Sequence, residues 1–213
     1  MSWENEVISG GTLARRVDPG EVRARLGEPT ERTRMKKSDR IDKYVHRFIA
    51  HSPFLTMATA DAAGNADCTP RGDYPGFAKV LDDRTLAIPD RPGNKLADSF
   101  GNLAENDGIG LLFLVPGVVE TVRVNGRAYC TDEPDVLIRM RTEASTPELA
   151  IVVEVAEVYF HCGRALLRSR LWDAASQDLA AEIPSMGEMV AEMLGGDSEA
   201  IERQLRAGYR ELF

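Results

Sequence analysis

Residues 88–96 (IPDRPGNKL) gather side chains that are suited to hold an anion. Arg91 can chelate two phosphate oxygens, and Lys95 adds a point charge. Gly93 lets a ligand approach the backbone closely. Asn94 is a strong N-cap candidate for a helix that begins at Lys95, and the free N–H groups and dipole of such a helix favour negative charge. These residues predict an anion site where a strand turns into a helix.

A second basic residue, Arg71, stands in the segment CTPRGDYPG at the end of another expected strand. If that strand pairs beside residues 84–89, Arg71 comes close to the same turn. The alternative is an ordinary capped turn in which Arg91 and Lys95 are simply solvated, since basic residues near helix caps are common. Spacing alone leaves both interpretations open.

Other patterns for site chemistry are missing from the sequence. His46, His51 and His161 are scattered and lack a metal-ligand spacing such as H-E-x-x-H, so no metal site is expected. Cys162 is more typical of a small buried hydrophobe than of a nucleophile. The motifs G-x-S-x-G, G-x-G-x-x-G and G-x-x-x-x-G-K-[ST] do not occur, so acyl transfer, a Rossmann site and a P-loop have no support.

Composition is that of a globular protein, with 43% hydrophobic and 28% charged residues in 213. The net charge of −8 disfavours nucleic-acid partners and makes a local basic cluster more informative. No stretch approaches the roughly 20 apolar residues of a membrane span, and the N-terminus lacks the pattern of a signal peptide. Three widely spaced cysteines suggest a reducing compartment. We therefore expect a cytoplasmic protein with no membrane partner.

The elements that must position these residues are mainly strands. Alternation and apolar runs bounded by turn residues predict strands over residues 54–60, 66–72, 77–82, 84–89, 108–117, 118–132 and 150–162. Asn125-Gly126 marks either a turn or a bulge in the sixth of these. Helical spacing predicts helices near 38–52 and 94–106 and in the acidic last 35 residues. Strands with few helices between them favour a small antiparallel barrel with helical additions.

The order of several segments resembles a known family. In sequence they are FLTMATAD, TPRGD, TLAIPDRPGNKLADS, GLLFLVPG followed by ETVRVNG, and C-x-[KR]-A-L-x-R-S-x-L-W. Together they resemble the pyridoxamine 5′-phosphate oxidase-like, FMN-binding split-barrel family, and more narrowly its bacterial flavin-nucleotide-binding branch related to pyridoxamine 5′-phosphate oxidase. The resemblance covers roughly residues 40–173.

This resemblance implies a mainly β (β+α) fold, a six-stranded antiparallel split β-barrel with flanking helices and a helical C-terminal tail. It also implies a homodimer that binds two FMN molecules in clefts between the protomers. The chain is then expected to divide into an N-terminal extension (1–37), an FMN-binding split-barrel domain (38–173) and a helical C-terminal appendage (174–213).

The resemblance also assigns site residues. Arg71 corresponds to a basic residue that faces the flavin or its phosphate. Gly93, Asn94 and Lys95 fall on the family's Ser-Arg-Lys phosphate loop, where only the lysine matches in type, so Arg91 is the candidate for the missing guanidinium. The other contacts it implies are Ile88 and Pro89 along the isoalloxazine, Glu120, Thr121 and Arg123 from the partner protomer, and the C-terminal Arg168, Ser169 and Trp172. Simple packing is an equal alternative for Trp172.

Two classes of function remain open. One is an FMN-dependent oxidoreductase acting on a small molecule, which suits a chain without an obvious catalytic acid or base, because the flavin carries the chemistry. The other is a flavin-binding carrier or sensor without turnover. The deazaflavin F420 is an alternative cofactor, whereas haem would require an axial histidine in the cleft. True pyridoxamine 5′-phosphate oxidases carry a C-terminal Arg-x-His; here Arg168 and Arg170 have no histidine after them, so an efficient oxidase of this kind is not expected.

Overall fold

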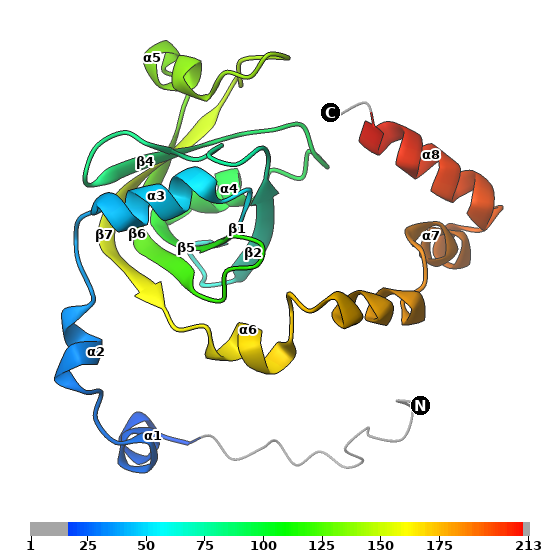
Figure 1. Ribbon diagram of the computed structural model, residues 1–213. Helices are drawn as coiled ribbons and strands as arrows, with labels where there is room; N and C mark the ends of the chain where they lie inside the picture. Colours follow the sequence, from blue (N-terminus) through cyan, green and yellow to red (C-terminus); the bar gives the residue numbers. More distant parts are fainter. Residues whose placement is uncertain (1–16, 211–213) are drawn as a thin grey trace. The chain divides into compact units, whose positions relative to one another are not determined.

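The structure is a computed structural model that describes residues 17–210 (Figure 1). The chain forms two units, Met1–Lys36 and Lys37–Phe213, and each is described by itself. In the first unit, α1 (Pro19–Leu26) begins after Asp18 and α2 (Glu31–Met35) begins after Thr30. Both cap residues accept hydrogen bonds from the first turn of their helix, and neither helix buries a residue.

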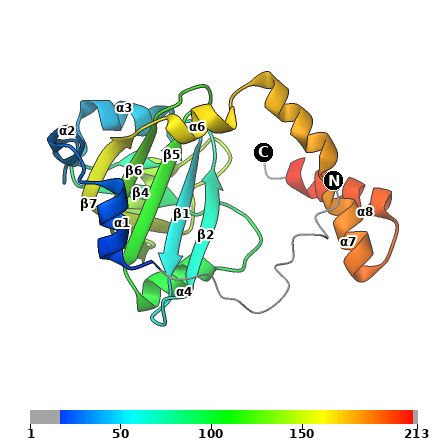
Figure 2. The same ribbon diagram turned by 90° about the horizontal axis from the view of Figure 1, so that it is seen from below.

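The second unit contains one antiparallel sheet in the order β2-β1-β5-β6-β7-β4-β3 (Figures 1 and 2). The strands are β1 (Phe54–Ala60), β2 (Ala66–Gly72), β3 (Lys79–Val80), β4 (Thr85–Pro89), β5 (Gly108–Leu114), β6 (Thr121–Thr131) and β7 (Ala150–His161). The predicted mainly β, antiparallel split barrel is confirmed. Hydrogen bonding defines seven strands rather than six, because the expected strand 77–82 contributes the two-residue β3.

The strand pairing that would place Arg71 beside residues 84–89 does not occur. The strand that carries Arg71, β2, pairs with β1, whereas β4 pairs with β7 and β3. β2 is therefore at one edge of the sheet and β4 is next to the other edge. The coiling of the sheet, and not a ladder of backbone hydrogen bonds, brings the ends of these strands together.

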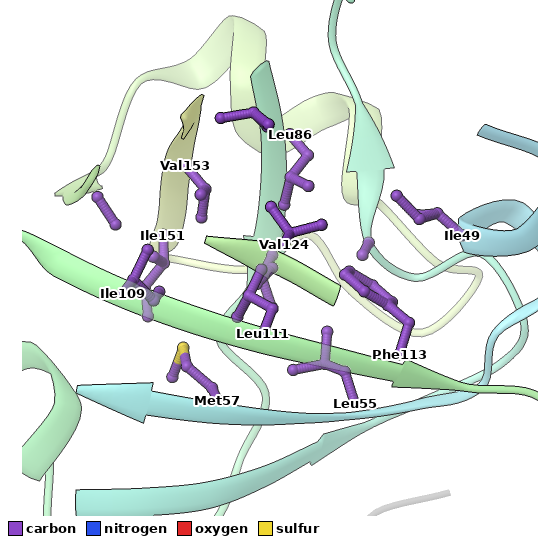
Figure 3. Close-up of a cluster of buried hydrophobic side chains, with 14 of the residues drawn as sticks. Ile49, Leu55, Met57, Leu86, Ile109, Leu111, Phe113, Val124, Ile151 and Val153 are labelled. Atoms are coloured by element: carbon purple, nitrogen blue, oxygen red, sulfur yellow. The ribbon is translucent and has the colours of Figure 1, made fainter. Parts of the chain in front are cut away.

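The barrel interior is a continuous apolar core (Figure 3). Leu55 on β1 is opposite Phe113 on β5, which is opposite Val122 on β6, and all three are fully buried. Figure 3 shows side chains from these strands and from β4 and β7 pointing toward one another. Helix α3 (Lys43–His51) adds Val45 and Ile49 to this core, so residues far apart in the sequence share one apolar interior.

Further helices complete the second unit, and one of them adds Leu103 to the core. They are α4 (Asp98–Glu105), α5 (Pro134–Leu137), the 3-10 segment η2 (Ile138–Met140), α6 (Arg164–Ser169), the 3-10 segment η3 (Ala174–Glu182), α7 (Met186–Leu194) and α8 (Ser198–Arg210). The backbone N–H of Gly187 in α7 donates to the Glu202 carboxylate in α8 and so links the two helices. A hydrogen bond from the Arg206 side chain and this one from Gly187 hold the pKa of Glu202 below its usual value. Within residues 17–210, no helix has the length and apolar character needed to cross a membrane.

Candidate functional site

A cavity of about 640 Å³ lies where three segments of the second unit meet. Its walls come from most of β2 (67–71), from the loop 90–97 with the first turn of α4 (98–100), and from the loop 145–148. This volume is within the range of about 300–1,000 Å³ that small-molecule and cofactor sites occupy. The turn that the sequence predicts to bind an anion lines this cavity, together with Arg71.

The inner face of β2 supplies the polar wall. Thr69 is opposite Met57, and Arg71 is opposite Leu55. Directly opposed residues project to the same face of a sheet, and Met57 and Leu55 belong to the buried core. Because β2 is an edge strand, its inward side chains extend beyond the core and face the cavity.

Arg71 is largely buried at this wall, with a side chain that is 21% exposed. One of its terminal nitrogens lies 3.3 Å from a carboxylate oxygen of Asp90, and its guanidinium carbon lies 6.0 Å from the centre of the Phe100 ring. Its Nε is buried and has no hydrogen-bond partner among the described residues. A buried donor without an acceptor costs about 1–3 kcal/mol. The Nε of Arg71 is therefore suited to receive an anionic ligand.

Arg91, the expected substitute for a phosphate-binding guanidinium, is already engaged. Its Nε donates to Asp73 over 2.5 Å, and a terminal nitrogen donates to the carbonyl of Met140 over 2.9 Å. Arg91 lines the cavity with a side chain that is 20% exposed. The structure thus places it in the wall, where Asp73 balances its charge.

The loop 90–97 differs from the helix start predicted at Lys95, and that prediction is wrong. Helix α4 begins at Asp98, after Ala97, and Asn94 accepts a hydrogen bond from the N–H of Leu96 instead of capping the helix. Lys95 and Ala97 both have φ of 62°, a left-handed conformation that interrupts a right-handed helix. The loop therefore offers side chains and turn N–H groups to the cavity, and no helix N-terminus at Lys95.

Not all the residues suggested by the family resemblance line this cavity. Gly93, Asn94 and Lys95 do so, with Arg71 and Arg91. Ile88 is in the barrel core and Pro89 is buried, and neither is in the cavity wall. The remaining residues lie outside the cavity wall: Glu120, Thr121, Arg123, Arg168, Ser169 and Trp172.

Those remaining residues belong to segments that adjoin each other in the second unit. The indole N–H of Trp172 donates to the carbonyl of Val118 over 2.8 Å, which fixes the segment after α6 to the turn before β6. Arg123 donates to the phenol oxygen of Tyr159 over 3.1 Å. Residues 118–123 and 168–172 form the second set of expected flavin contacts, and none of them is in the cavity wall.

Strand register places Arg71 of the cavity wall and Arg123 of the second set on opposite faces of the sheet. Arg71 shares the inner face with Leu55, Phe113 and Val122, because these residues oppose one another across β2, β1, β5 and β6. Arg123 follows Val122 directly and so projects from the opposite face. The side chains of Arg71 and Arg123 therefore leave opposite faces of one sheet, on strands three positions apart in its order.

A sequence model of the pyridoxamine 5′-phosphate oxidase family matches residues 41–162, more than half of the chain. The protein belongs to this family. The match spans α3, the whole sheet and the loop 90–97, so the cavity of this pyridoxamine 5′-phosphate oxidase family member lies within the matched region. A comparison with curated proteins finds no match.

Solved structures similar to this chain are distant. HupZ of Group A Streptococcus is 18% identical, with 56% of this chain and 93% of that chain covered and a TM-score of 0.46. An FMN-binding protein of Syntrophomonas wolfei is 14% identical, with 53% and 80% covered and a TM-score of 0.42. HutZ, the heme storage protein of Vibrio cholerae, is 12% identical, with 58% and 94% covered and a TM-score of 0.41. Similarities at this level carry no argument about function.

Several residues of the family member's cavity were not expected from its sequence. The described wall includes the acidic residues Asp67, Asp90, Asp98 and Glu148 beside the three basic residues. Asp73, which holds Arg91, stands two residues after Arg71 in PRGD, and that short spacing was the available signal. Phe100 lies within the predicted helix 94–106, and its ring also lies next to the guanidinium of Arg71.

Cys68 is a free, exposed cysteine in the cavity wall, whereas Cys130 lies outside that wall. Cys130 on β6 is exposed as a residue, yet the atoms around its thiol desolvate it enough to raise its pKa, and the nearby Asp90 carboxylate adds to that effect. A thiol with a raised pKa stays protonated at neutral pH and is a poor nucleophile. The residues that the structure describes include no cluster of three or more histidine, cysteine, aspartate or glutamate side chains able to hold a metal.

Proposed function

We propose that this protein binds FMN in a homodimer and acts as an FMN-dependent oxidoreductase on a small molecule. The observation that carries the proposal is the buried, unpartnered Nε of Arg71 at the wall of a cavity of about 640 Å³, in a chain of the pyridoxamine 5′-phosphate oxidase family. A donor of this kind and a cavity of this size suit the phosphate and ring system of a flavin nucleotide.

The residues present fit FMN at the phosphate end. Arg71 offers its free Nε, and the exposed Lys95 has no hydrogen-bond or ion-pair partner among the described residues. The carboxylates of Asp67, Asp98 and Glu148 line the same cavity, and they would repel a phosphate from other positions. When bound, the flavin would supply hydride or electron transfer, while the chain orients it and excludes water.

The homodimer is proposed because Arg71 and Arg123, one from each set of expected flavin contacts, project from opposite faces of the sheet. A flavin held by Arg71 and Lys95 could meet the second set only if that set came from another chain. Arg123 of the partner subunit and Trp172 of the partner subunit would then face the flavin edge. The hydrogen bond from Trp172 to Val118 keeps the C-terminal and β6 segments of this set together.

Reconstitution with FMN tests the proposal. We expect a yellow protein with flavin absorbance after desalting, and a light-scattering mass equal to two chains. A colourless monomer that ignores added FMN would contradict both parts. Anaerobic addition of NADH or NADPH then separates the functional classes: bleaching supports an oxidoreductase, whereas a bound flavin that no reductant bleaches supports a carrier or sensor.

The protein should not be an efficient pyridoxamine 5′-phosphate oxidase. A phosphorylated substrate needs a second cluster of donors beside that for the flavin phosphate, but Arg91 is occupied by Asp73 and Met140. With FMN-loaded protein and oxygen, formation of pyridoxal 5′-phosphate from pyridoxamine or pyridoxine phosphate should remain well below about 1 per second. Turnover at or above that rate would contradict this prediction.

A further inference from the structure

We propose that Asp73 and Arg91 form a positioning latch, which holds the loop 90–97 and keeps Arg71 available to a ligand anion. This inference rests on the proposed function, because the anion in question is the phosphate of FMN. In this proposal Arg91 positions the loop and keeps Arg71 available, and does not itself contact the phosphate. We call this ion pair the Asp73–Arg91 latch.

The latch joins two strand ends that no backbone ladder connects. Asp73 follows β2 at one edge of the sheet, and Arg91 follows β4 near the other edge. Their side chains are only 15% and 20% exposed, and Arg91 Nε lies 2.5 Å from a carboxylate oxygen of Asp73. By contrast, the pair Arg127–Asp107 is 75% and 50% exposed. Burial reduces solvent screening, so the latch is the stronger restraint.

Both ends of the latch are themselves fixed. The N–H of Asp73 donates to the carbonyl of Pro53 over 3.1 Å. Arg91 also donates to the carbonyl of Met140 over 2.9 Å, and the N–H of the preceding Asp90 donates to the carbonyl of Leu149 over 2.9 Å. The latch therefore connects the residue before β1, the segment after β4 and the η2 segment around the start of the cavity loop.

The latch also keeps the Asp73 carboxylate paired with Arg91, so that it is not available to Arg71. Asp73 lies two residues after Arg71 and directly follows the last residue of β2. In the structure Asp73 is engaged by Arg91, while Arg71 has the 3.3 Å contact with Asp90, the ring of Phe100 beside it and a free Nε. Without Arg91, the unpaired Asp73 carboxylate would compete with a phosphate for Arg71.

The experiment compares wild-type protein with Asp73→Asn and with the matched control Asp107→Asn, which removes the partner of the exposed Arg127. Asp73→Asn should weaken FMN binding about tenfold, because the loop must then be ordered when FMN binds, and should change riboflavin binding by less than about twofold. Amide hydrogen exchange in 90–97 should be faster in the ligand-free variant. Asp107→Asn should leave all of these quantities unchanged.

Three results would overturn the latch. They are unchanged FMN affinity with unchanged loop exchange, equal losses for FMN and riboflavin, and the same losses in Asp107→Asn. If Asp73→Asn does not fold, Arg91→Lys replaces it, and the latch again requires a selective loss of FMN affinity. If wild-type protein binds no flavin, the proposed function fails, while the exchange comparison in ligand-free protein still supports or overturns the latch.

Discussion

Gly126→Ala should destabilise the barrel by about 3 kcal/mol or more, because an alanine does not fit between β6 and β7. A Cβ at this position would lie 2.0 Å from the carbonyl oxygen of Glu154 and 3.0 Å from its carbonyl carbon. These are backbone atoms of the neighbouring strand and cannot rotate away. The register between the two strands shifts between Asn125 and Gly126, so the glycine lies at a bulge in the central pair of strands.

The matched control is Gly101→Ala on α4. A Cβ there meets nothing within 4 Å and lies on an exposed helix surface, so the substitution should stabilise the protein by about 0.5–1 kcal/mol. Urea unfolding of both variants measures the two effects, which should have opposite signs. A Gly126→Ala protein that unfolds at the wild-type denaturant concentration would show that β6 and β7 separate at low cost.

Arg71→Ala should weaken FMN binding about tenfold or more, with a smaller effect on riboflavin. A charge-assisted hydrogen bond contributes about 1.5–3 kcal/mol, and tenfold corresponds to about 1.4 kcal/mol. The substitution removes the free Nε donor and also leaves the carboxylate of Asp90 unbalanced beside the ligand. Titration followed by flavin fluorescence gives both affinities. Lys95→Ala should act in the same direction.

Two controls separate this effect from a general loss of structure. Arg127→Ala removes a guanidinium whose side chain is 75% exposed and which is not in the described cavity wall, so FMN affinity should not change. Asp90→Asn in the Arg71→Ala background should recover part of the lost affinity by removing the unbalanced carboxylate. Equal losses for FMN and riboflavin, or no loss for either, would remove the argument for a phosphate site at Arg71.

The sequence predicted only part of the local backbone structure at the site and in β6. The composition of 88–96 correctly indicated a turn rich in cationic and flexible residues that now lines a cavity. The predicted helix start at Lys95 was wrong. Lys95 and Ala97 adopt left-handed conformations, for which non-glycine residues give no clear sequence signal. Asn125-Gly126 left a turn and a bulge open, and pairing of a continuous β6 with β7 decided for the bulge.

The sequence by itself determined the class of fold and the family. Alternation of apolar and polar residues sets which side chains face inward, and the order of motifs along the chain can be read without knowing which strands pair. Only the tertiary structure decided how the site is assembled. β2 and β4 are not paired, yet the coiled sheet brings Arg71 to Asp90 and Asp73 to Arg91. Periodicity encodes the face of a residue within its own strand, whereas these contacts depend on how distant strand ends meet when the barrel curls.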